Sequence, residues 1–126
     1  MLFKKSLNEG YVKGVEKDKL RAKSLVNSAD NTLLAVADIQ IKEQNYNTIV
    51  RELYESLRQY CEAIGYLYGY KFLSHEVITI FLAEILKQEE ISLIFDRYRK
   101  LRNGINYYGK NVSKETVEVA LSEIPK

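Results

Sequence analysis

The chain has 126 residues, of which 46% are apolar and 29% charged, and its formal net charge is only +2 at pH 7. These values are ordinary for one globular domain, so we expect a single domain over residues 1–126 with its core at about 18–124. No apolar run approaches the ~20 residues of a membrane span, and no signal-peptide pattern opens the chain. We therefore expect a cytoplasmic protein that makes no membrane contact.

The sequence contains one cysteine, Cys61, and one histidine, His75. A lone cysteine excludes an internal disulfide, and a lone histidine excludes a metal site built from several imidazoles. Because Cys61 falls within a helical pattern, we expect it to be a buried core thiol. We predict no metal and no cofactor.

Apolar residues recur at intervals of three and four, and the only proline is Pro125, which predicts helices throughout the chain. A short helix is expected near residues 2–9, followed by a linker over residues 11–17. Asp18 is the expected N-cap of a long helix that runs to about Lys42. Its predicted inner face consists of Leu25, Ala29, Thr32, Val36 and Ile39.

Asn47 is expected to cap the next helix, which should run to about Tyr68 and end at Gly69. Its apolar residues form a heptad-like stripe. The stripe consists of Val50, Leu53, Leu57, Tyr60, Ile64 and Leu67.

Three further helices are predicted in the rest of the chain. Ser74 should cap a helix to Lys87, a long helix should follow over residues 89–108 until Gly109 ends it, and Ser113 should cap a short last helix. The residues expected to face inward on these helices are Val77, Ile78, Phe81, Leu82, Ile85, Ile91, Ile94, Phe95, Tyr98, Leu101, Ile105, Val117, Ala120, Leu121 and Ile124.

Four substantial helices joined by short loops fold most simply as an up-down antiparallel four-helix bundle. The two short terminal helices are expected to pack on the outside of this bundle. Residues 66–72 are aromatic, but Gly65 and Gly69 favour a helix end there, so no strand is predicted. The fold class is therefore predicted to be all-α.

The segment 95–110, FDRYRKLRNGINYYGK, carries the strongest functional signal. From Arg97 to Lys110 there are five positive residues and no acid, whereas the whole chain carries only +2, so the remaining residues sum to −3. Cations interleaved with tyrosines suit a phosphate or a single-stranded nucleic acid. The same composition also suits a helix C-terminus, where the helix dipole stabilises cations. The cations expected to be solvated are Arg97, Arg99 and Lys100.

Tyr98, Arg102 and Asn106 are separated by four residues each, so they should share one helix face. Arg102 can hold a phosphate with two parallel hydrogen bonds, Asn106 can donate and accept, and Tyr108 adds a phenol. The structural alternative is that Arg102 pairs with an acid such as Glu62, while Asn106 binds carbonyls at the helix end and the tyrosines pack.

His75 lies at the expected start of a helix, directly after the cap Ser74. In a regular bundle this start and the end of the following helix lie at the same end, so His75 and Arg102 could line one pocket. His75 would then supply the proton transfer that an arginine cannot provide. The alternative is a surface or capping role.

Three segments together resemble small archaeal or bacterial proteins of the HEPN superfamily. They are the tyrosine-bearing helix VRELYESLRQYCEAIGYLYG, the SHEV start of the next helix, and RYRKLRNGINYYGK. The resemblance implies a four-helix bundle over about residues 18–124 and, in many members, metal-independent endoribonuclease activity. Other members are thought to bind nucleotides or RNA without cutting. The resemblance also implies a homodimer with two facing motifs, and a minimal nucleotidyltransferase as the partner in a toxin–antitoxin pair.

The family motif is an arginine, commonly followed by asparagine, with a histidine four to six positions beyond. Arg102 and Asn103 match its first half, but no histidine occurs over residues 106–109. Because arginine and asparagine do not exchange protons near neutral pH, the binding half of the motif is retained and the proton-transfer half is not.

Three functions are left open by the sequence. The first is a module that binds a nucleotide or RNA through Arg102, Asn103, Asn106, Tyr107 and Tyr98. The second is a ribonuclease with the candidate catalytic residues Arg102, Asn106, Tyr108 and His75. The third is a non-catalytic homodimeric interaction protein, which the ten tyrosines of the chain favour.

Overall fold

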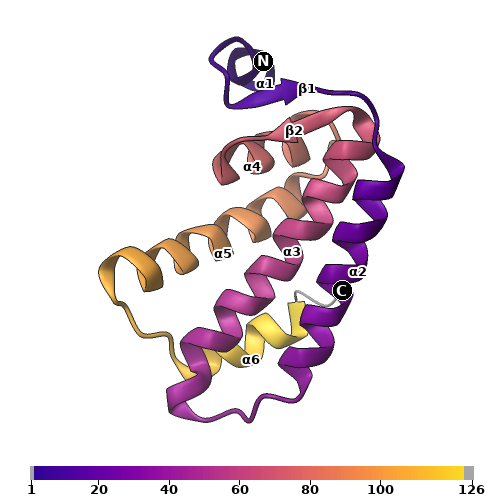
Figure 1. Cartoon of the computed structure of the whole chain (residues 1–126). Helices are drawn as coiled ribbons and strands as arrows, with labels where there is room; N and C mark the ends of the chain where they lie inside the picture. The colour runs from indigo at the N-terminus through magenta and orange to yellow at the C-terminus, as the bar shows by residue number, and fades with distance from the viewer. Residues whose placement is uncertain (1, 124–126) are drawn as a thin grey trace.

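The computed structural model describes residues 2–123, and Ile124, which was expected to face inward, lies outside them. Within residues 2–123 the chain forms six α-helices, one 3-10 turn and a two-stranded sheet (Figure 1). The helices are α1 (Leu2–Asn8), α2 (Lys19–Ala37), α3 (Tyr46–Tyr68), α4 (His75–Glu84), α5 (Glu89–Tyr108) and α6 (Lys114–Glu123). The other elements are β1 (Val12–Gly14), η1 (Glu43–Asn45) and β2 (Tyr70–Phe72). The mostly helical class that the sequence predicts is confirmed.

The helix α3 is the centre of the fold. α2 packs along it, α5 and α6 contact it from other sides, and α4 packs on α5. The main core lies between these helices and includes Val50, Leu53, Tyr54, Ile78, Phe95, Tyr98, Ile105, Val117 and Ala120. A smaller core of Phe3, Val12, Val77 and Phe81 lies where α1 and the sheet meet α4.

Local signals in the sequence place several helix ends correctly. The Asp18 side chain accepts a hydrogen bond from the Arg21 N–H at the start of α2, and Ser74 caps α4 in the same way. Gly69 and Gly109 end α3 and α5 in the left-handed conformation, with φ of 87° and 63°. Glycine adopts this conformation without the clash that a Cβ atom would cause.

The prediction that the chain has no strand is wrong. β1 and β2 pair antiparallel, with Val12 opposite Phe72, so the predicted linker 11–17 contains a strand. Strands of three residues are too short to show an alternating pattern, and their pairing depends on a contact between residues nearly 60 positions apart.

Of the two terminal helices expected on the outside, α1 does pack there, against α4 and β1, whereas α6 contributes to the main core. Phe3 of α1 is buried beside Phe81, and Val117 and Ala120 of α6 are fully buried in the main core. Both helices are short and have few apolar residues. Those of α1 cover apolar surface on α4, and those of α6 cover apolar surface on α3.

Three predicted helix boundaries need correction. α2 ends at Ala37 and α4 at Glu84, several residues earlier than expected. After α4 the chain turns at Lys87, which has a φ of 57°, and a lysine gives no sequence signal for that conformation. Asn47 does not cap α3; it lies inside the helix, and its side chain instead accepts from the Val112 N–H.

Most residues that were expected to face inward are buried or half-buried, but Leu67 and Ile91 are exposed. A heptad stripe drifts around a straight helix by roughly 20° per heptad, so by the end of α3 it has turned away from the core. Ile91 lies in the first turn of α5. None of the helices within residues 2–123 is long and apolar enough to cross a bilayer.

Candidate functional site

Arg102 lies on α5 and is half-buried. Among residues 2–123 it makes no ion pair, and its Nη1 donates only to the Asn103 side-chain oxygen, at 3.3 Å. The predicted alternative of a pair with Glu62 is wrong, because Glu62 pairs with Arg58 on the same helix, α3. Arg102 is therefore a partly desolvated cation whose nearest polar partner is a neutral amide.

His75, the first residue of α4, forms the second part of the site. Its Nδ1 lies 3.0 Å from the hydroxyl of Tyr54, a fully buried residue of α3. Burial lowers the pKa of His75, and the positive charges of Arg58 and Arg102 lower it further, with Glu55 opposing them. The imidazole is therefore neutral at pH 7, which suits a proton acceptor better than a donor.

Arg102 and Tyr54 belong to the same electrostatic environment. Burial raises the pKa of the Tyr54 hydroxyl, whereas the charge of Arg102 is the largest influence in the opposite direction. The charge of Arg102 lowers the pKa of both Tyr54 and His75, which contact each other, so we treat the three residues as one candidate site. We call this group, together with Arg58 and Arg99, the arginine cluster.

Arg58 and Arg99, the other members of the arginine cluster, already have acidic partners. Arg58 pairs with Glu55 and Glu62, and the Arg99 Nη2 lies 2.8 Å from an oxygen of Asp96. Arg99 is thus mostly buried rather than solvated, contrary to the sequence-based expectation. Arg102 is the cation of the cluster that has no carboxylate partner among residues 2–123.

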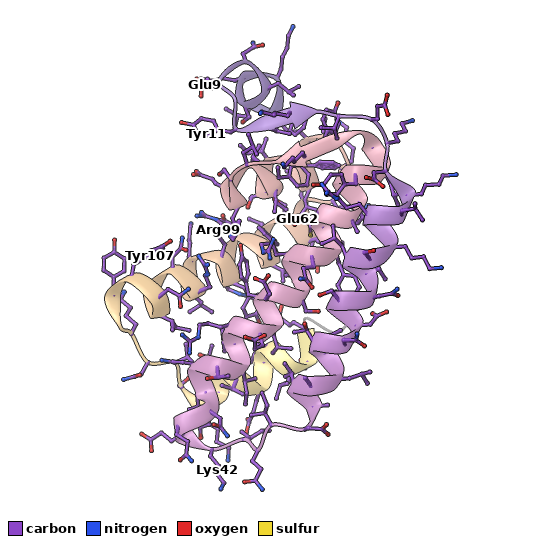
Figure 2. All side chains as sticks on the ribbon, viewed as in Figure 1. Glu9, Tyr11, Lys42, Glu62, Arg99 and Tyr107 are labelled. Carbon is purple, nitrogen blue, oxygen red and sulfur yellow. The ribbon has the colours of Figure 1, made fainter. Side chains whose placement is uncertain are left out.

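Asn106 lies one turn beyond Arg102, on the exposed surface. Its side-chain oxygen accepts from the Arg51 Nη1 of α3 at 3.5 Å, whereas the alternative considered above had the Asn106 amide donating to carbonyls at the helix end. Tyr107 and Tyr108 follow at the end of α5 and are 71% and 78% exposed. Figure 2 shows Tyr107 pointing away from the rest of the molecule.

Tyr98 does not join this group. It is buried, and its hydroxyl donates to the Glu123 Oε1 of α6 at 2.9 Å. Positions four apart on a helix differ by about 40°, so a stripe that begins at Tyr98 turns toward another neighbour by Asn106. The structure places Arg102 beside Asn103, His75 against Tyr54, and Tyr98 against α6.

The sequence did not identify Tyr54, Arg58 or Arg99 as site residues. Tyr54 and Arg58 are four residues apart on α3, and Arg99 and Arg102 are three apart on α5. This spacing shows that each pair shares a helix face, but nothing in the sequence indicates that the two faces meet.

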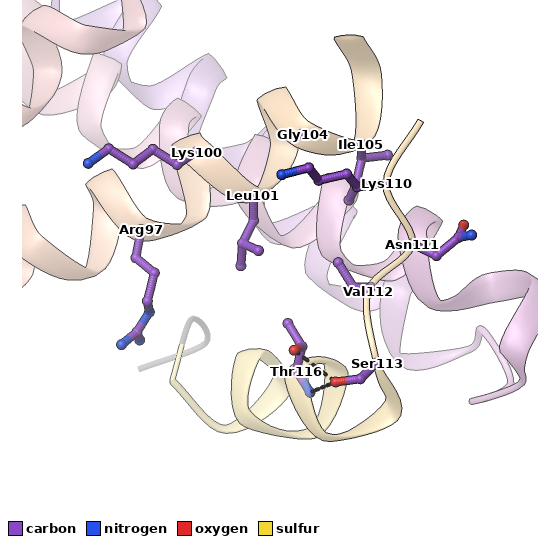
Figure 3. A pocket seen from close by; sticks show the side chains of 10 residues that line it. All are labelled: Arg97, Lys100, Leu101, Gly104, Ile105, Lys110, Asn111, Val112, Ser113 and Thr116. Carbon is purple, nitrogen blue, oxygen red and sulfur yellow. Dashed lines mark hydrogen bonds between the residues drawn. The ribbon is translucent and has the colours of Figure 1, made fainter. Parts of the chain in front are cut away.

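A separate cavity of about 530 Å³ lies on the other side of α5, between α5, the segment 109–113 and α6 (Figure 3). Leu101 and Val112 point into it, and Arg97, Lys100 and Lys110 stand at its rim. The charges of two rim cations are offset, because Arg97 pairs with Glu123 and Lys100 with Asp96. Among residues 2–123, Lys110 is the rim cation that has no carboxylate partner.

Cys61 is buried, as expected for a core thiol, and burial raises its pKa to about 12. Within residues 2–123 no three histidine, cysteine, aspartate or glutamate side chains come together as metal ligands would. The chain matches no protein-family model, no curated protein and no solved structure.

Proposed function

We propose that this chain is a HEPN-like RNA-binding protein in which Arg102 holds a backbone phosphate. The observation that carries the proposal is the half-buried Arg102 guanidinium, which has no carboxylate partner among residues 2–123. A partly desolvated cation without a counter-charge is costly, and a bound anion offsets that cost. In this reading α2 to α5 are the four bundle helices.

RNA is a better candidate than a small anion because of what surrounds Arg102. Arg51 and Asn106 extend the polar surface along α3 and α5, and the exposed Tyr107 and Tyr108 follow at the end of α5. Exposed aromatic rings beside cations are typical of single-strand binding, since every base can stack on a ring. From the resemblance we also propose a cytoplasmic homodimer and a minimal nucleotidyltransferase as the toxin–antitoxin partner.

Metal-independent RNA cleavage is a second candidate function, supported by the contact between His75 and Tyr54 beside Arg102. His75 would accept the proton of a 2′-hydroxyl, and Arg102 would stabilise the negative charge of the transition state. Asn106, by contrast, has an amide side chain, which neither accepts nor releases a proton near neutral pH. Cleavage in this chain therefore depends on His75.

Binding can be tested by fluorescence anisotropy with a labelled single-stranded oligoribonucleotide in the presence of a chelator. Arg102→Ala should weaken binding by at least about tenfold, because a charge-assisted pair of hydrogen bonds is lost. Arg97→Ala is the matched control, since it removes the same charge from the other side of α5. Equal losses in both variants, with circular dichroism showing intact helices, would contradict a phosphate site at Arg102.

Cleavage can be tested on the same RNA by gel electrophoresis. A ribonuclease of the proposed kind should lose cleavage in both Arg102→Ala and His75→Asn. Cleavage that survives in His75→Asn but is lost in Arg102→Ala would exclude His75 as the proton acceptor. Equal cleavage by all variants would identify a contaminating nuclease.

A further inference from the structure

The hydroxyl of Tyr54 is buried where α3 meets α4. The whole side chain is buried, and its ring packs against Phe95 with 5.4 Å between the ring centres. Among residues 2–123 the hydroxyl has one hydrogen-bond partner, the His75 Nδ1 at 3.0 Å. A buried hydroxyl hydrogen without an acceptor is costly, so the direction of this one hydrogen bond matters.

The protonation of the two groups limits the possible directions. Burial raises the pKa of the Tyr54 hydroxyl, which therefore keeps its hydrogen at neutral pH. Burial lowers the pKa of His75, and the charges of Arg58 and Arg102 lower it further, so the imidazole is neutral. A neutral imidazole has one donor nitrogen and one acceptor nitrogen. A proton on Nδ1 would point at the Tyr54 oxygen, whereas a proton on Nε2 leaves Nδ1 free to accept from Tyr54.

We infer that Tyr54 donates its hydroxyl hydrogen to Nδ1 and so keeps the His75 proton on Nε2. The opposite tautomer would leave the buried hydroxyl hydrogen unbonded, which should make that tautomer at least about fivefold less populated. Tyr54 is then a positioning residue. It is buried away from any ligand, but it determines which nitrogen of His75 acts as a hydrogen-bond donor.

The tautomer determines which group of an RNA His75 can bind, and this step rests on the proposed function. The two nitrogens of an imidazole point in nearly opposite directions, so Nε2 faces away from the buried Tyr54. His75 is partly exposed, and among residues 2–123 its Nε2 makes no hydrogen bond. Phosphodiester oxygens only accept hydrogen bonds, so they match an Nε2–H donor. His75 is therefore a second donor to the RNA backbone, near the phosphate that Arg102 holds.

The same tautomer argues against the cleavage candidate. Taking the proton of a 2′-hydroxyl requires a nitrogen with a free lone pair. In the proposed tautomer that nitrogen is Nδ1, which is directed at the Tyr54 hydroxyl. Nε2 would accept a proton only after its own proton had moved to Nδ1. A His75 that carries its proton on Nε2 thus favours binding without cutting.

Nitrogen NMR measures the tautomer directly. His75 is the only histidine of the chain, so isotope-labelled histidine in the protein without a histidine tag gives one pair of ring nitrogens. At about pH 8 the imidazole is neutral, and correlation with the ring C–H protons shows which nitrogen carries the proton. We expect a protonated Nε2 and an unprotonated Nδ1. A proton on Nδ1 in the wild-type protein would overturn the proposal.

Tyr54→Phe tests whether the hydroxyl sets the tautomer, since it keeps the ring and removes only the donor. The Nδ1 signal should shift, and the share of imidazole with a proton on Nδ1 should rise severalfold. Tyr60→Phe is the matched control, because it removes a hydroxyl of α3 that donates to Asp30 instead. It should leave both nitrogen signals unchanged. Identical signals in wild type and Tyr54→Phe, with circular dichroism showing intact helices, would overturn the role of Tyr54.

Two substitutions of His75 test its role as a donor to RNA. The amide nitrogen of a glutamine can reach the position of Nε2 and donate there, whereas a leucine of similar size has no donor. Both substitutions remove the acceptor of the Tyr54 hydroxyl, so the difference between them isolates the Nε2 donor. At about pH 8, His75→Gln should keep RNA affinity within about threefold, and His75→Leu should weaken it by at least about fivefold. Equal affinities of the two variants would overturn the donor role.

The tautomer is measured without RNA, so its outcome is independent of the proposed function. A wild-type protein that binds no RNA would overturn the RNA proposal and the donor role of His75, and the tautomer would stand. RNA binding that depends on Arg102 but is equal in His75→Gln and His75→Leu would leave the phosphate site standing. RNA cleavage by the wild-type protein that His75→Gln abolishes would overturn the inference that His75 binds without cutting.

Discussion

The two sides of α5 both carry an arginine, but only one of these two arginines has a carboxylate partner among residues 2–123. On the side of α6, the Arg97 Nη2 lies 2.6 Å from Glu123, and Tyr98 donates to the same carboxylate. On the side of α3 and α4, Arg102 has only the neighbouring amide of Asn103. The basic stretch that the sequence shows as one feature is therefore two surfaces, and carboxylates on other elements determine which cations are left without a counter-charge.

The helix α5 therefore carries cations that stabilise the fold and also Arg102, which has no carboxylate partner among residues 2–123. Successive residues on a helix are rotated by about 100°, so cations that are adjacent in sequence meet different neighbours. Arg97, with its guanidinium 5.2 Å from the centre of the Tyr98 ring, belongs to the contact with α6. Arg102 acts on Tyr54 and His75 instead.

The largest expected effect is on stability and comes from the α6 side. Tyr98→Ala should lower the free energy of unfolding by roughly 3–5 kcal/mol, because it leaves a cavity in the main core and removes the partner of Glu123. Urea denaturation followed by circular dichroism measures this change. Tyr107→Ala, at an exposed position of the same helix, should change stability by less than about 0.5 kcal/mol. Similar values for the two tyrosines would contradict the difference between their environments.

A second change tests the geometry of Arg102 rather than its charge. Arg102→Lys keeps the positive charge but loses the planar guanidinium and its paired donors. We expect RNA affinity to fall by about three- to tenfold, measured by anisotropy, with unchanged stability. Wild-type affinity in this variant would mean that Arg102 acts only as a point charge.

The pH dependence of RNA binding should report on His75. A phosphate bound beside Arg58 and Arg102 would offset the charges that lower the pKa of His75, so binding should take up a proton. Affinity should therefore rise several-fold as the pH falls from about 7.5 to about 5.5, and His75→Asn should remove most of that rise. An identical pH profile in both proteins would place the phosphate away from His75.

In the free protein the lowered pKa of His75 makes the free energy of unfolding depend on pH. Below about pH 6.5 the unfolded chain binds a proton at His75 before the folded chain does. Stability should then fall as the pH is lowered through that range, and His75→Asn should reduce the fall. Thermal unfolding at several pH values provides the measurement.

The smallest effect is expected for the exposed ion pair on the α6 side. Arg97→Ala should cost less than about 1 kcal/mol of stability, because the Arg97 side chain is 54% exposed and solvent screens its attraction to Glu123. Glu123→Gln should cost more than Arg97→Ala, since Glu123 also accepts from the buried Tyr98. Urea denaturation of the two variants would show the reverse order if Tyr98 did not depend on this carboxylate.

Features that depend on residues close together along the chain could be predicted without the structure. The bounds of α5 and the caps Asp18 and Ser74 follow from local chemistry, and so do the stops at Gly69 and Gly109. Each is set by a side chain that bonds to the backbone two or three positions away, or by a glycine that permits a left-handed turn. The mostly helical class follows in the same way from the spacing of apolar residues.

Contacts between residues of different elements, by contrast, could not be predicted from the sequence. The pairing of β1 with β2, the contact of His75 with Tyr54 and the pairing of Arg97 with Glu123 join residues 21 to 60 positions apart. No local pattern encodes such pairs, because they depend on how whole helices pack. The lack of a carboxylate at Arg102 has the same origin, since Glu62 faces Arg58 along α3 instead. Local bonding thus set the elements of this protein, and packing between them left Arg102 without a carboxylate partner among residues 2–123.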